Sequence, residues 1–461
     1  MGSGYVVEGI IRPEKFGGIY YERDRLVIEM LNSVGYEILK LLKEDKNEAE
    51  IVEALKNEYG VEEDIIKNDV KAFIEYLLKS KYIRSEKEVV SEQTETKKTA
   101  NTATMFSNKD FVLGMEPYEL ATPLKVLLEL TYSCNLRCIH CFADADYCTK
   151  IENHNNELGY EDWCKVIDNI VKNNVFEILL SGGEATMRKD LFKIAEYIQS
   201  KGRSYSLLTN ATLIDEEKAK MLKRTGCAKV ESNLDGYDAE TYESFRGVKG
   251  SFDKTVKGIQ ACLNEGIPVR CNVMETKVTV FNLKKIVDKA YEIGVREVCV
   301  IPLENGGRAK TNDKLAFGEQ DQEKLLEFYK DVNEWFDEKY KDTDMVLFTP
   351  NLFNRGEGRF TKLFDIANIM PRCGAGLIHC TINPYGIVKM CPSDESLLVR
   401  ENNSAVTHDL GEIWRNSRVL KNVRSSNFKK CVHCDSECNR QCPITRTELE
   451  GSYEYECEKG A

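Results

Sequence analysis

The sequence lacks any run of about 20 apolar residues, the length that a helix needs to cross a bilayer. Its first ten residues, MGSGYVVEGI, have neither the basic region nor the apolar core of a secretory signal. Lys and Arg are outnumbered by Asp and Glu, 64 against 76, and the net charge of −12 disfavours a nucleic-acid backbone as partner. We therefore expect a cytoplasmic protein with no membrane and no nucleic-acid partner.

Cysteine is absent before Cys134, although the chain contains 17 cysteines. Three lie in the stretch CNLRCIHC and eight crowd between Cys373 and Cys457. Because disulfides are rare in reducing compartments, such clusters predict metal ligands or redox groups. The dispersed cysteines are expected to be small buried apolar side chains: Cys148, Cys164, Cys227, Cys262, Cys271 and Cys299.

The chain of 461 residues is long enough for several domains. Residues 1–88 combine strand patterns with three helical patterns, which predicts a winged-helix-like module, and the polar, Thr-rich residues 89–118 predict a linker. Residues 119–318 alternate six strands with helices, which predicts an α/β fold with a parallel sheet, either doubly wound or an incomplete barrel. A connecting segment, residues 319–369, precedes a cysteine-rich domain at 370–461, expected to be held together by metal.

The stretch CNLRCIHC follows the first predicted barrel strand, and SGGE, TN and SNLDG follow later strands. Folds of this class place their chemistry at the carboxyl ends of parallel strands. Thiolates suit an iron–sulfur cluster, and three of them leave one of four irons open for a ligand. Zinc is the competing interpretation, but its fourth ligand would be His140, which directly precedes Cys141 and needs an awkward geometry.

The spacing of Cys134, Cys138 and Cys141, with His140 in the place of an aromatic residue, resembles that of the radical S-adenosylmethionine (radical SAM) enzymes. The resemblance implies a partial (β/α)6 TIM-type barrel, a catalytic 4Fe–4S cluster and bound S-adenosyl-L-methionine. For Arg246, the alternative is an exposed structural arginine. The resemblance assigns cofactor contacts to seven residues: His140, Gly182, Gly183, Glu184, Asn210, Ser232 and Arg246.

The cysteine spacing after residue 370 resembles the SPASM domain, which carries two auxiliary 4Fe–4S clusters and would bring the total to three. Gly386 stands five residues before Cys391, as in that family, but only three residues separate Cys434 from Cys438, where the family usually has five. By position, the resemblance assigns Cys373, Cys380, Cys391 and Cys442 to one auxiliary cluster, and Cys431, Cys434, Cys438 and Cys457 to the other.

The N-terminal module resembles the PqqD-like domains that bind the leader of a precursor peptide as an extra strand at a sheet edge. Residues 1–85 contain 13 Lys or Arg and 17 Asp or Glu, the wrong balance for DNA. Either GGIYYERD or its neighbour LVIEML is the predicted edge strand. SFRGVKGSF and CGAG resemble segments of peptide-modifying radical SAM enzymes.

These resemblances together imply a maturase of ribosomally made peptides (RiPP maturation), of the sactipeptide or ranthipeptide type. Such an oxidoreductase forms thioether crosslinks from cysteine sulfur to carbon through a 5′-deoxyadenosyl radical and needs an external electron donor. Carbon–carbon crosslinking and formylglycine-type oxidation are alternatives on the same scaffold. An iron–sulfur redox sensor with a DNA-binding winged helix is the alternative from another class.

Overall fold

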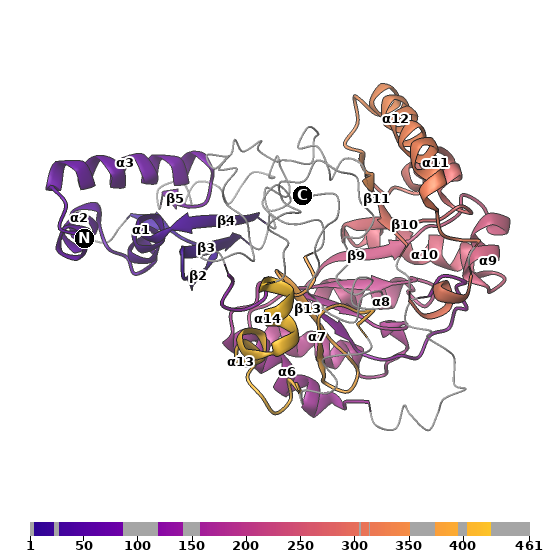
Figure 1. The fold of residues 1–461 in the computed structure, drawn as a ribbon, viewed down its shortest axis with the longest axis horizontal. Coiled ribbons are helices and arrows are strands. Elements are labelled where there is room, and N and C mark those ends of the chain that lie inside the picture. The colour runs from indigo at the N-terminus through magenta and orange to yellow at the C-terminus, as the bar shows by residue number, and fades with distance from the viewer. Residues whose placement is uncertain are drawn as a thin grey trace. The chain divides into compact units, whose positions relative to one another are not determined.

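The computed structural model describes residues 4–22, 27–85, 119–141, 157–303, 306–312, 314–350, 374–394 and 403–425 (Figure 1). The chain divides into two compact units, one containing the described residues up to Ala121 and the other containing those from Thr122 onward. The linker predicted at residues 89–118 lies outside the described residues. No helix of the described part is long and apolar enough to span a membrane.

The N-terminal unit has a three-stranded antiparallel sheet in the order β2-β3-β4, followed by three helices. A short pair of strands, β1 and β5, joins the two ends of the unit. The elements are β1 (Tyr5–Val6), β2 (Ile10–Glu14), β3 (Gly17–Glu22), β4 (Val27–Asn32), α1 (Ser33–Lys43), α2 (Glu48–Tyr59), α3 (Glu63–Lys79) and β5 (Arg84–Ser85).

Local sequence signals account for the helix starts in this unit. The side chain of Asn47 accepts from the Glu50 amide, and the Glu50 carboxylate accepts from the Asn47 amide, a reciprocal capping box. Asn32 caps α1 in the same manner by accepting from the amide of Gly35. The apolar stripes of the helices then meet Tyr20 and Leu31 of the sheet in one core. The predicted strand-then-helix module is confirmed.

The second unit is built on a sheet of nine strands in the order β12-β11-β10-β9-β8-β7-β6-β13-β14, of which all but β14 pair in parallel. The strands that carry the predicted barrel motifs are β6 (Lys125–Glu129), β7 (Glu177–Ser181), β8 (Tyr205–Thr209), β9 (Cys227–Asn233), β10 (Val269–Glu275) and β11 (Glu297–Pro302). The predicted partial barrel is therefore confirmed.

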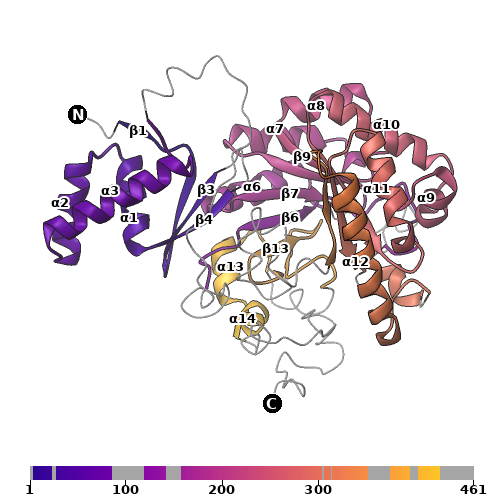
Figure 2. The ribbon, with the colours of Figure 1, turned by 90° about the horizontal axis from the view of Figure 1, so that it is seen from above.

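Helices follow the strands and line the outside of the curved sheet (Figure 2). They are α6 (Tyr160–Lys172), α7 (Leu191–Ser200), α8 (Glu216–Arg224), α9 (Ala239–Arg246), α10 (Ser251–Asn264), α11 (Leu283–Glu292) and α12 (Gln322–Lys339). Short 3-10 turns occur at η1 (Ala185–Met187), η2 (Val280–Asn282), η3 (Gly307–Thr311) and η4 (Glu319–Asp321), and β12 (Val346–Phe348) ends the barrel. The connecting helix expected within residues 319–369 is α12.

Alternate residues of the barrel strands face different environments, as the period of two requires. One set, including Val126, Val230 and Cys271, packs with the helices in the main apolar core. The other set carries charges, and Lys229 Nζ lies 2.7 Å from Glu297 Oε2 while Arg270 pairs with the same carboxylate. This face therefore carries a group of paired charges, which the apolar strand sequences alone did not predict.

The C-terminal segment continues the barrel sheet. Its strand β13 (His379–Ile382) pairs in parallel with β6, and β14 (Val388–Lys389) folds back against β13. The turn between them needs Gly386, whose φ is +79° and whose added Cβ would lie 2.9 Å from Val406 Cγ2. Two helices complete the described part: α13 (Leu410–Asn416) and α14 (Arg418–Ser425).

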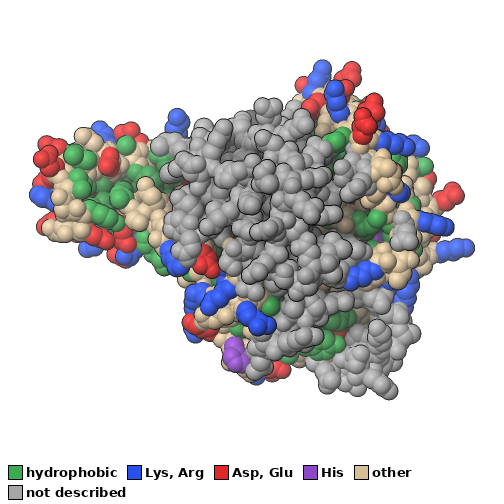
Figure 3. Space-filling view, viewed as in Figure 1, with side chains coloured by type: hydrophobic (Ala, Val, Ile, Leu, Met, Phe, Trp, Pro, Cys, Tyr) green, Lys and Arg blue, Asp and Glu red, His purple; other side chains and the backbone are tan. Residues whose placement is uncertain are grey.

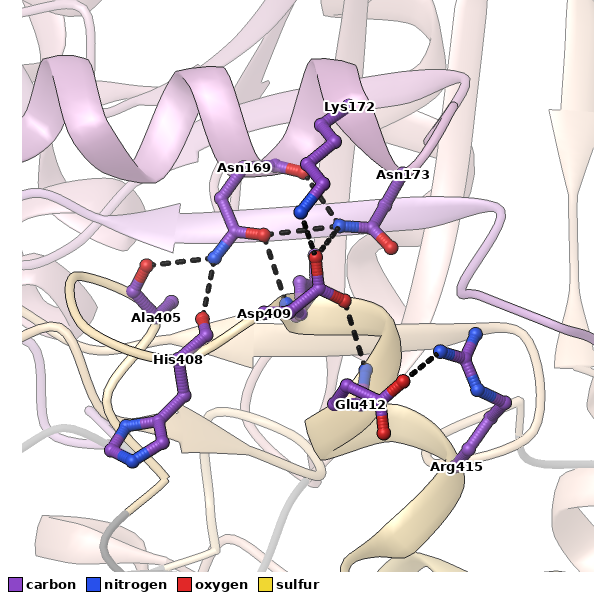
Figure 4. Close-up of polar contacts among 9 residues, drawn as sticks. Asn169, Lys172, Asn173, Ala405, His408, Asp409, Glu412 and Arg415 are labelled. Carbon is purple, nitrogen blue, oxygen red and sulfur yellow. Dashed lines mark hydrogen bonds and ion pairs between the residues drawn. The ribbon is translucent and has the colours of Figure 1, made fainter.

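Asn169 of α6 connects the barrel to the segment before α13 (Figure 4). Its Nδ2 donates to the carbonyl oxygens of Ala405 and His408, at 2.9 and 2.7 Å, and its Oδ1 accepts from the Leu410 amide at 2.9 Å. Asp409 caps α13 and also pairs with Lys172 at 3.0 Å. These contacts join residues more than 230 positions apart.

Candidate active site at the carboxyl ends of the strands

The three motif cysteines lie on one loop after β6. Cys134 and Cys138 are 8% exposed, Cys141 is partly buried, and all three belong to a small apolar cluster with Leu136 and Val248. The Leu136 amide points at Cys134 Sγ at 3.4 Å. Burial raises the pKa of the Cys134 thiol to about 12 despite this amide. A thiolate here therefore needs a positively charged partner such as a metal centre.

The donor set of the cysteine loop suits an iron–sulfur cluster. Such a cluster takes one thiolate at each ligated iron, so its ligands need not converge on one point. Three sheltered thiols lie on one loop, and an amide is directed at one of the sulfurs. Among the described residues, no three His, Cys, Asp or Glu side chains converge on one metal ion.

The SGGE stretch packs against the cysteine loop. The Gly183 amide donates to Thr131 O at 2.7 Å and the Glu184 amide to Ser133 O at 2.8 Å. A Cβ on Gly182 would lie 2.3 Å from Thr131 O, and one on Gly183 would lie 2.4 Å from Ser133 O. The sequence predicted glycines for close approach to a ligand; the structure shows that they also allow close approach to the loop that holds the cysteines.

Glu184 is held by the next strand. Its Oε1 accepts from the hydroxyls of Thr186 and Thr209, at 2.5 and 2.7 Å, and its Oε2 accepts from the Asn210 amide at 2.7 Å. The side chain is 1% exposed. The carboxylate thus joins the ends of β7 and β8, a role for which the sequence held no signal.

Asn210 extends this network to the cysteine loop. Its Nδ2 donates to Asn135 Oδ1 at 2.8 Å, and its Oδ1 accepts from Thr212. Asn135 in turn donates to Thr212 Oγ1 at 2.8 Å. Asn135 was not among the predicted site residues, although its place directly after Cys134 was the available signal.

Ser232 and Asn233 face opposite sides of β9. Ser232 is level with Cys271, which packs in the core beneath the helices, and its buried Oγ has no hydrogen-bond partner among the described residues. Asn233 follows on the concave face. A cofactor contact from the end of β9 therefore suits Asn233 better than the predicted Ser232, because a strand turns successive side chains to opposite faces.

His140 and Arg246 are both packed rather than exposed. The His140 ring stacks on Phe245, with centroids 4.5 Å apart, and burial together with the Arg246 and Arg308 charges holds its pKa well below the usual range. Arg246 is 4% exposed, pairs with the buried Asp235, and directs Nη1 at Cys138 Sγ at 3.4 Å. Arg246 is therefore buried rather than exposed, and the S-adenosylmethionine contact that the resemblance assigns to it stays a prediction.

The C-terminal motif is described in part. Cys380 lies in β13 level with Val126, is 0% exposed and packs in the apolar core, while Cys391 follows β14 and is partly buried. Both ligand assignments stay predictions. The remaining proposed auxiliary ligands lie outside the described residues: Cys373, Cys431, Cys434, Cys438, Cys442 and Cys457.

The dispersed cysteines are buried as predicted wherever they are described. Exposed fractions are between 0 and 9% for Cys164, Cys227, Cys262, Cys271 and Cys299. Burial raises the pKa of Cys271 and of Cys299, so both remain protonated. Cys148 lies outside the described residues.

Residues 128–290 match the model of the radical SAM superfamily. The chain carries a radical SAM domain. This domain contains the cysteine loop, SGGE, Asn210 and β9, and the family implies a 4Fe–4S cluster with S-adenosylmethionine at this site. Residues 19–83 match the model of coenzyme PQQ synthesis protein D (PqqD), so the N-terminal unit is a PqqD-like domain.

The chain is similar to relatives whose names indicate different activities. Fe-coproporphyrin III synthase of Methanosarcina barkeri is 39% identical over 199 residues, which cover 43% of this chain and 49% of that protein. This chain therefore matches about half the length of that relative. The subtilosin biosynthesis protein AlbA of Bacillus subtilis is 28% identical over 71% of this chain and 66% of its own length.

The solved structure of Streptococcus suis SuiB bound to S-adenosylmethionine is similar over 99% of both chains, with a TM-score of 0.67 and 16% identity. The same protein bound to precursor peptide SuiA gives a TM-score of 0.65 at 18% identity and covers 99% of this chain and 98% of that chain. At this identity the likeness establishes the fold, from the N-terminal unit through the C-terminal segment.

The PqqD-like domain decides between the two stretches that the sequence offered as the edge strand. GGIYYERD forms β3, which is the central strand of its sheet, with β2 on one side and β4 on the other. Among the two predicted edge stretches, only LVIEML, which forms β4, lies at an edge of the described sheet. Figure 3 shows apolar side chains gathered on this unit among charged ones, and Tyr59, Val61 and Ile65 are exposed.

Proposed function

We propose that the chain is a radical SAM maturase of a ribosomally made precursor peptide, which joins a cysteine sulfur to a carbon of another residue. The observation that carries this proposal is the presence of a PqqD-like domain and a radical SAM domain on one chain. The precursor's leader would bind as an added strand at an edge of the sheet, and β4, one of the two edge strands of the described sheet, is the edge that the sequence also offered.

The barrel residues would position the cofactors and keep them apart from water. When bound, the cluster and S-adenosylmethionine supply a carbon radical that removes a hydrogen atom from the substrate. Cys134, Cys138 and Cys141 would hold the cluster, and the backbone of SGGE, Asn210 and the end of β9 would line the S-adenosylmethionine. The network of Glu184, Asn210 and Asn135 fixes these elements relative to one another before the cofactors arrive.

Thioether formation removes two hydrogens from the peptide, one from carbon and one from the thiol, and forms one carbon–sulfur bond. The hydrogen atom taken from carbon accounts for one electron, and the thiol releases a proton, so one further electron needs an acceptor. Two auxiliary 4Fe–4S clusters on the eight C-terminal cysteines would provide it, which makes three clusters in all. An external electron donor would complete each turnover.

Tetrapyrrole chemistry is the second candidate, because Fe-coproporphyrin III synthase is 39% identical over 199 residues of this chain. Mass spectrometry of a co-expressed Cys-containing precursor separates the candidates. A thioether lowers the peptide mass by two hydrogens and consumes one thiol, so one cysteine fewer reacts with iodoacetamide. The same mass loss with every thiol still reactive indicates a carbon–carbon crosslink.

A peptide of unchanged mass, together with a tetrapyrrole consumed in the presence of S-adenosylmethionine, would overturn the proposal. Absence of 5′-deoxyadenosine on reduction, with the cluster present, would instead indicate the redox sensor. Conversion of serine to formylglycine also removes two hydrogens and leaves every thiol reactive, so its reactive aldehyde distinguishes it from a carbon–carbon crosslink. Conversion of cysteine to formylglycine exchanges the thiol for an aldehyde oxygen and is recognised by its larger mass loss.

A further inference from the structure

Arg246 contacts the sulfur of a motif cysteine from outside the cysteine loop. It is the last residue of α9, and its Nη1 lies 3.4 Å from Cys138 Sγ in a site where the arginine is 4% exposed. We propose that Arg246 is a positioning residue that holds Cys138 as a cluster ligand and, through its N–H···S hydrogen bond, makes the cluster easier to reduce. This inference rests on the proposed function only in requiring that the three cysteines bind a cluster.

The backbone keeps α9 and the cysteine loop in register. The Arg137 amide donates to Arg246 O at 3.0 Å, and the Ile139 amide donates to Phe245 O at 3.1 Å. Gly247 ends the helix at a φ of +74°, and a Cβ there would lie 2.5 Å from Arg137 O. The close approach that delivers the guanidinium to Cys138 is therefore built into both segments.

Asp235 makes the burial of Arg246 tolerable and aims it. Its Oδ2 pairs with Arg246 Nη2, while its Oδ1 accepts from the Met274 amide of β10 at 2.7 Å. An unpaired buried guanidinium would cost several kcal/mol. With the carboxylate in place the pair is close to neutral, so the local N–H dipole at Cys138 is the main electrostatic effect on the sulfur.

Arg308 holds the same loop by a different contact. Its Nε donates to Cys138 O at 2.8 Å and its amide donates to Cys141 O at 2.9 Å. These bonds position the backbone of the loop, whereas Arg246 contacts the ligating atom itself. Hydrogen bonds to the ligating sulfurs are among the factors that set the reduction potential of iron–sulfur clusters, because they stabilise the added negative charge of the reduced state.

The test is a redox titration followed by electron paramagnetic resonance, using the signal that changes when S-adenosylmethionine is added. We expect Arg246→Gln to retain iron. At a fixed potential, its ratio of reduced to oxidised cluster should be about tenfold lower than in the wild type, which corresponds to a midpoint potential lower by ~59 mV for a one-electron couple. Arg246→Lys, which keeps a charged donor, should recover part of this shift.

Arg188→Gln is the matched control, because Arg188 is partly buried, with a side chain 11% exposed, pairs with Asp190 at 2.8 Å and donates to Leu130 O, and none of its described contacts is to a cysteine. It should leave the potential unchanged. An unshifted potential in iron-loaded Arg246→Gln overturns the inference. If that variant holds no cluster, Asp235→Asn is measured in its place. The guanidinium of Arg246 then lacks its counter-charge and should shift the reduction potential of the cluster to more positive values. An unchanged potential in Asp235→Asn overturns the inference. A wild-type chain without iron at the three cysteines would contradict the proposed function instead.

Discussion

At the scale of single residues, the site depends on buried polar side chains that are satisfied by distant partners. Glu184 is the clearest case, since its two carboxylate oxygens accept from Thr186, Thr209 and Asn210. A buried acceptor group left without its donors costs about 1–3 kcal/mol. We therefore expect that a change at such a residue lowers the stability of the fold and also weakens cofactor binding.

We expect Glu184→Gln to lower the melting temperature and to weaken S-adenosylmethionine binding. The amide can accept at one oxygen only, so its NH2 group would face the Asn210 amide or the Thr209 hydroxyl, and the loss should be about 1–3 kcal/mol. Thermal denaturation and calorimetric titration with S-adenosylmethionine measure the two effects. Glu196→Gln, on the surface and paired only with Arg224 in the described part, is the control and should change neither.

Replacement of Cys134, Cys138 and Cys141 together by Ala should remove the catalytic cluster and leave the auxiliary clusters. Anaerobic reconstitution of the intact chain is expected to yield about twelve irons, four for each of three clusters. The triple variant should contain about eight and form no 5′-deoxyadenosine. Cofactor cleavage that survives in this variant would show that the cluster is held elsewhere.

At the scale of elements, the barrel and the C-terminal segment form one sheet and one core. Strand β13 pairs with β6, the strand that leads into the cysteine loop, and Trp414 of α13 is buried in the same core as the barrel helices. The predicted boundary at residue 370 therefore separates sequence motifs rather than independently packed bodies. Disturbing the C-terminal segment should consequently affect the barrel.

Asn169→Ala tests this coupling. The change removes three hydrogen bonds to the segment from Ala405 to Leu410, two of them part-buried and one exposed, which should cost about 1–3 kcal/mol in all. Limited proteolysis should cut the C-terminal part of the variant faster than that of the wild type. Asn282→Ala removes only a long, exposed contact of 3.5 Å and should leave the proteolysis rate unchanged. Equal rates for both variants would mean that Asn169 does not hold the segment.

At the scale of the whole molecule, we propose that the chain divides substrate capture from chemistry. The PqqD-like unit and the barrel unit have separate cores, and no motif cysteine lies in the first. A tethering domain raises the effective concentration of its peptide near the active site. Removing it should therefore impair crosslinking far more than the cofactor chemistry.

Deletion of residues 1–88 should leave the iron content and the peptide-independent cleavage of S-adenosylmethionine intact, while crosslinking of the full precursor falls at least tenfold at sub-saturating peptide. Mass spectrometry of the precursor and chromatography of 5′-deoxyadenosine measure the two activities. Excess free leader should inhibit the intact enzyme by competition and should not inhibit the truncated one. Crosslinking at the wild-type rate by the truncated chain would exclude leader binding by the PqqD-like unit.

Local signals were enough to predict most of the elements and the cluster loop. Several features depend only on residues that are close together in the sequence, so each can be predicted without knowing its tertiary contacts. They are the capping box at Asn47, the helical periodicity of α1 to α3 and the six strand patterns of the barrel. The spacing of Cys134, Cys138 and Cys141 after a predicted strand likewise depends on a few consecutive positions. Features with this short range are determined by the sequence by itself.

Only the tertiary structure decided which groups meet. Arg246 and Cys138 are 108 positions apart, and Asn210 and Asn135 are 75 apart, so their contacts depend on how strands order themselves in the sheet. The central position of β3, the face of Ser232 and the addition of β13 to the barrel follow from the same packing. The hydrophobic effect that drives this packing is non-directional, and it sets these neighbours through the fit of the whole core.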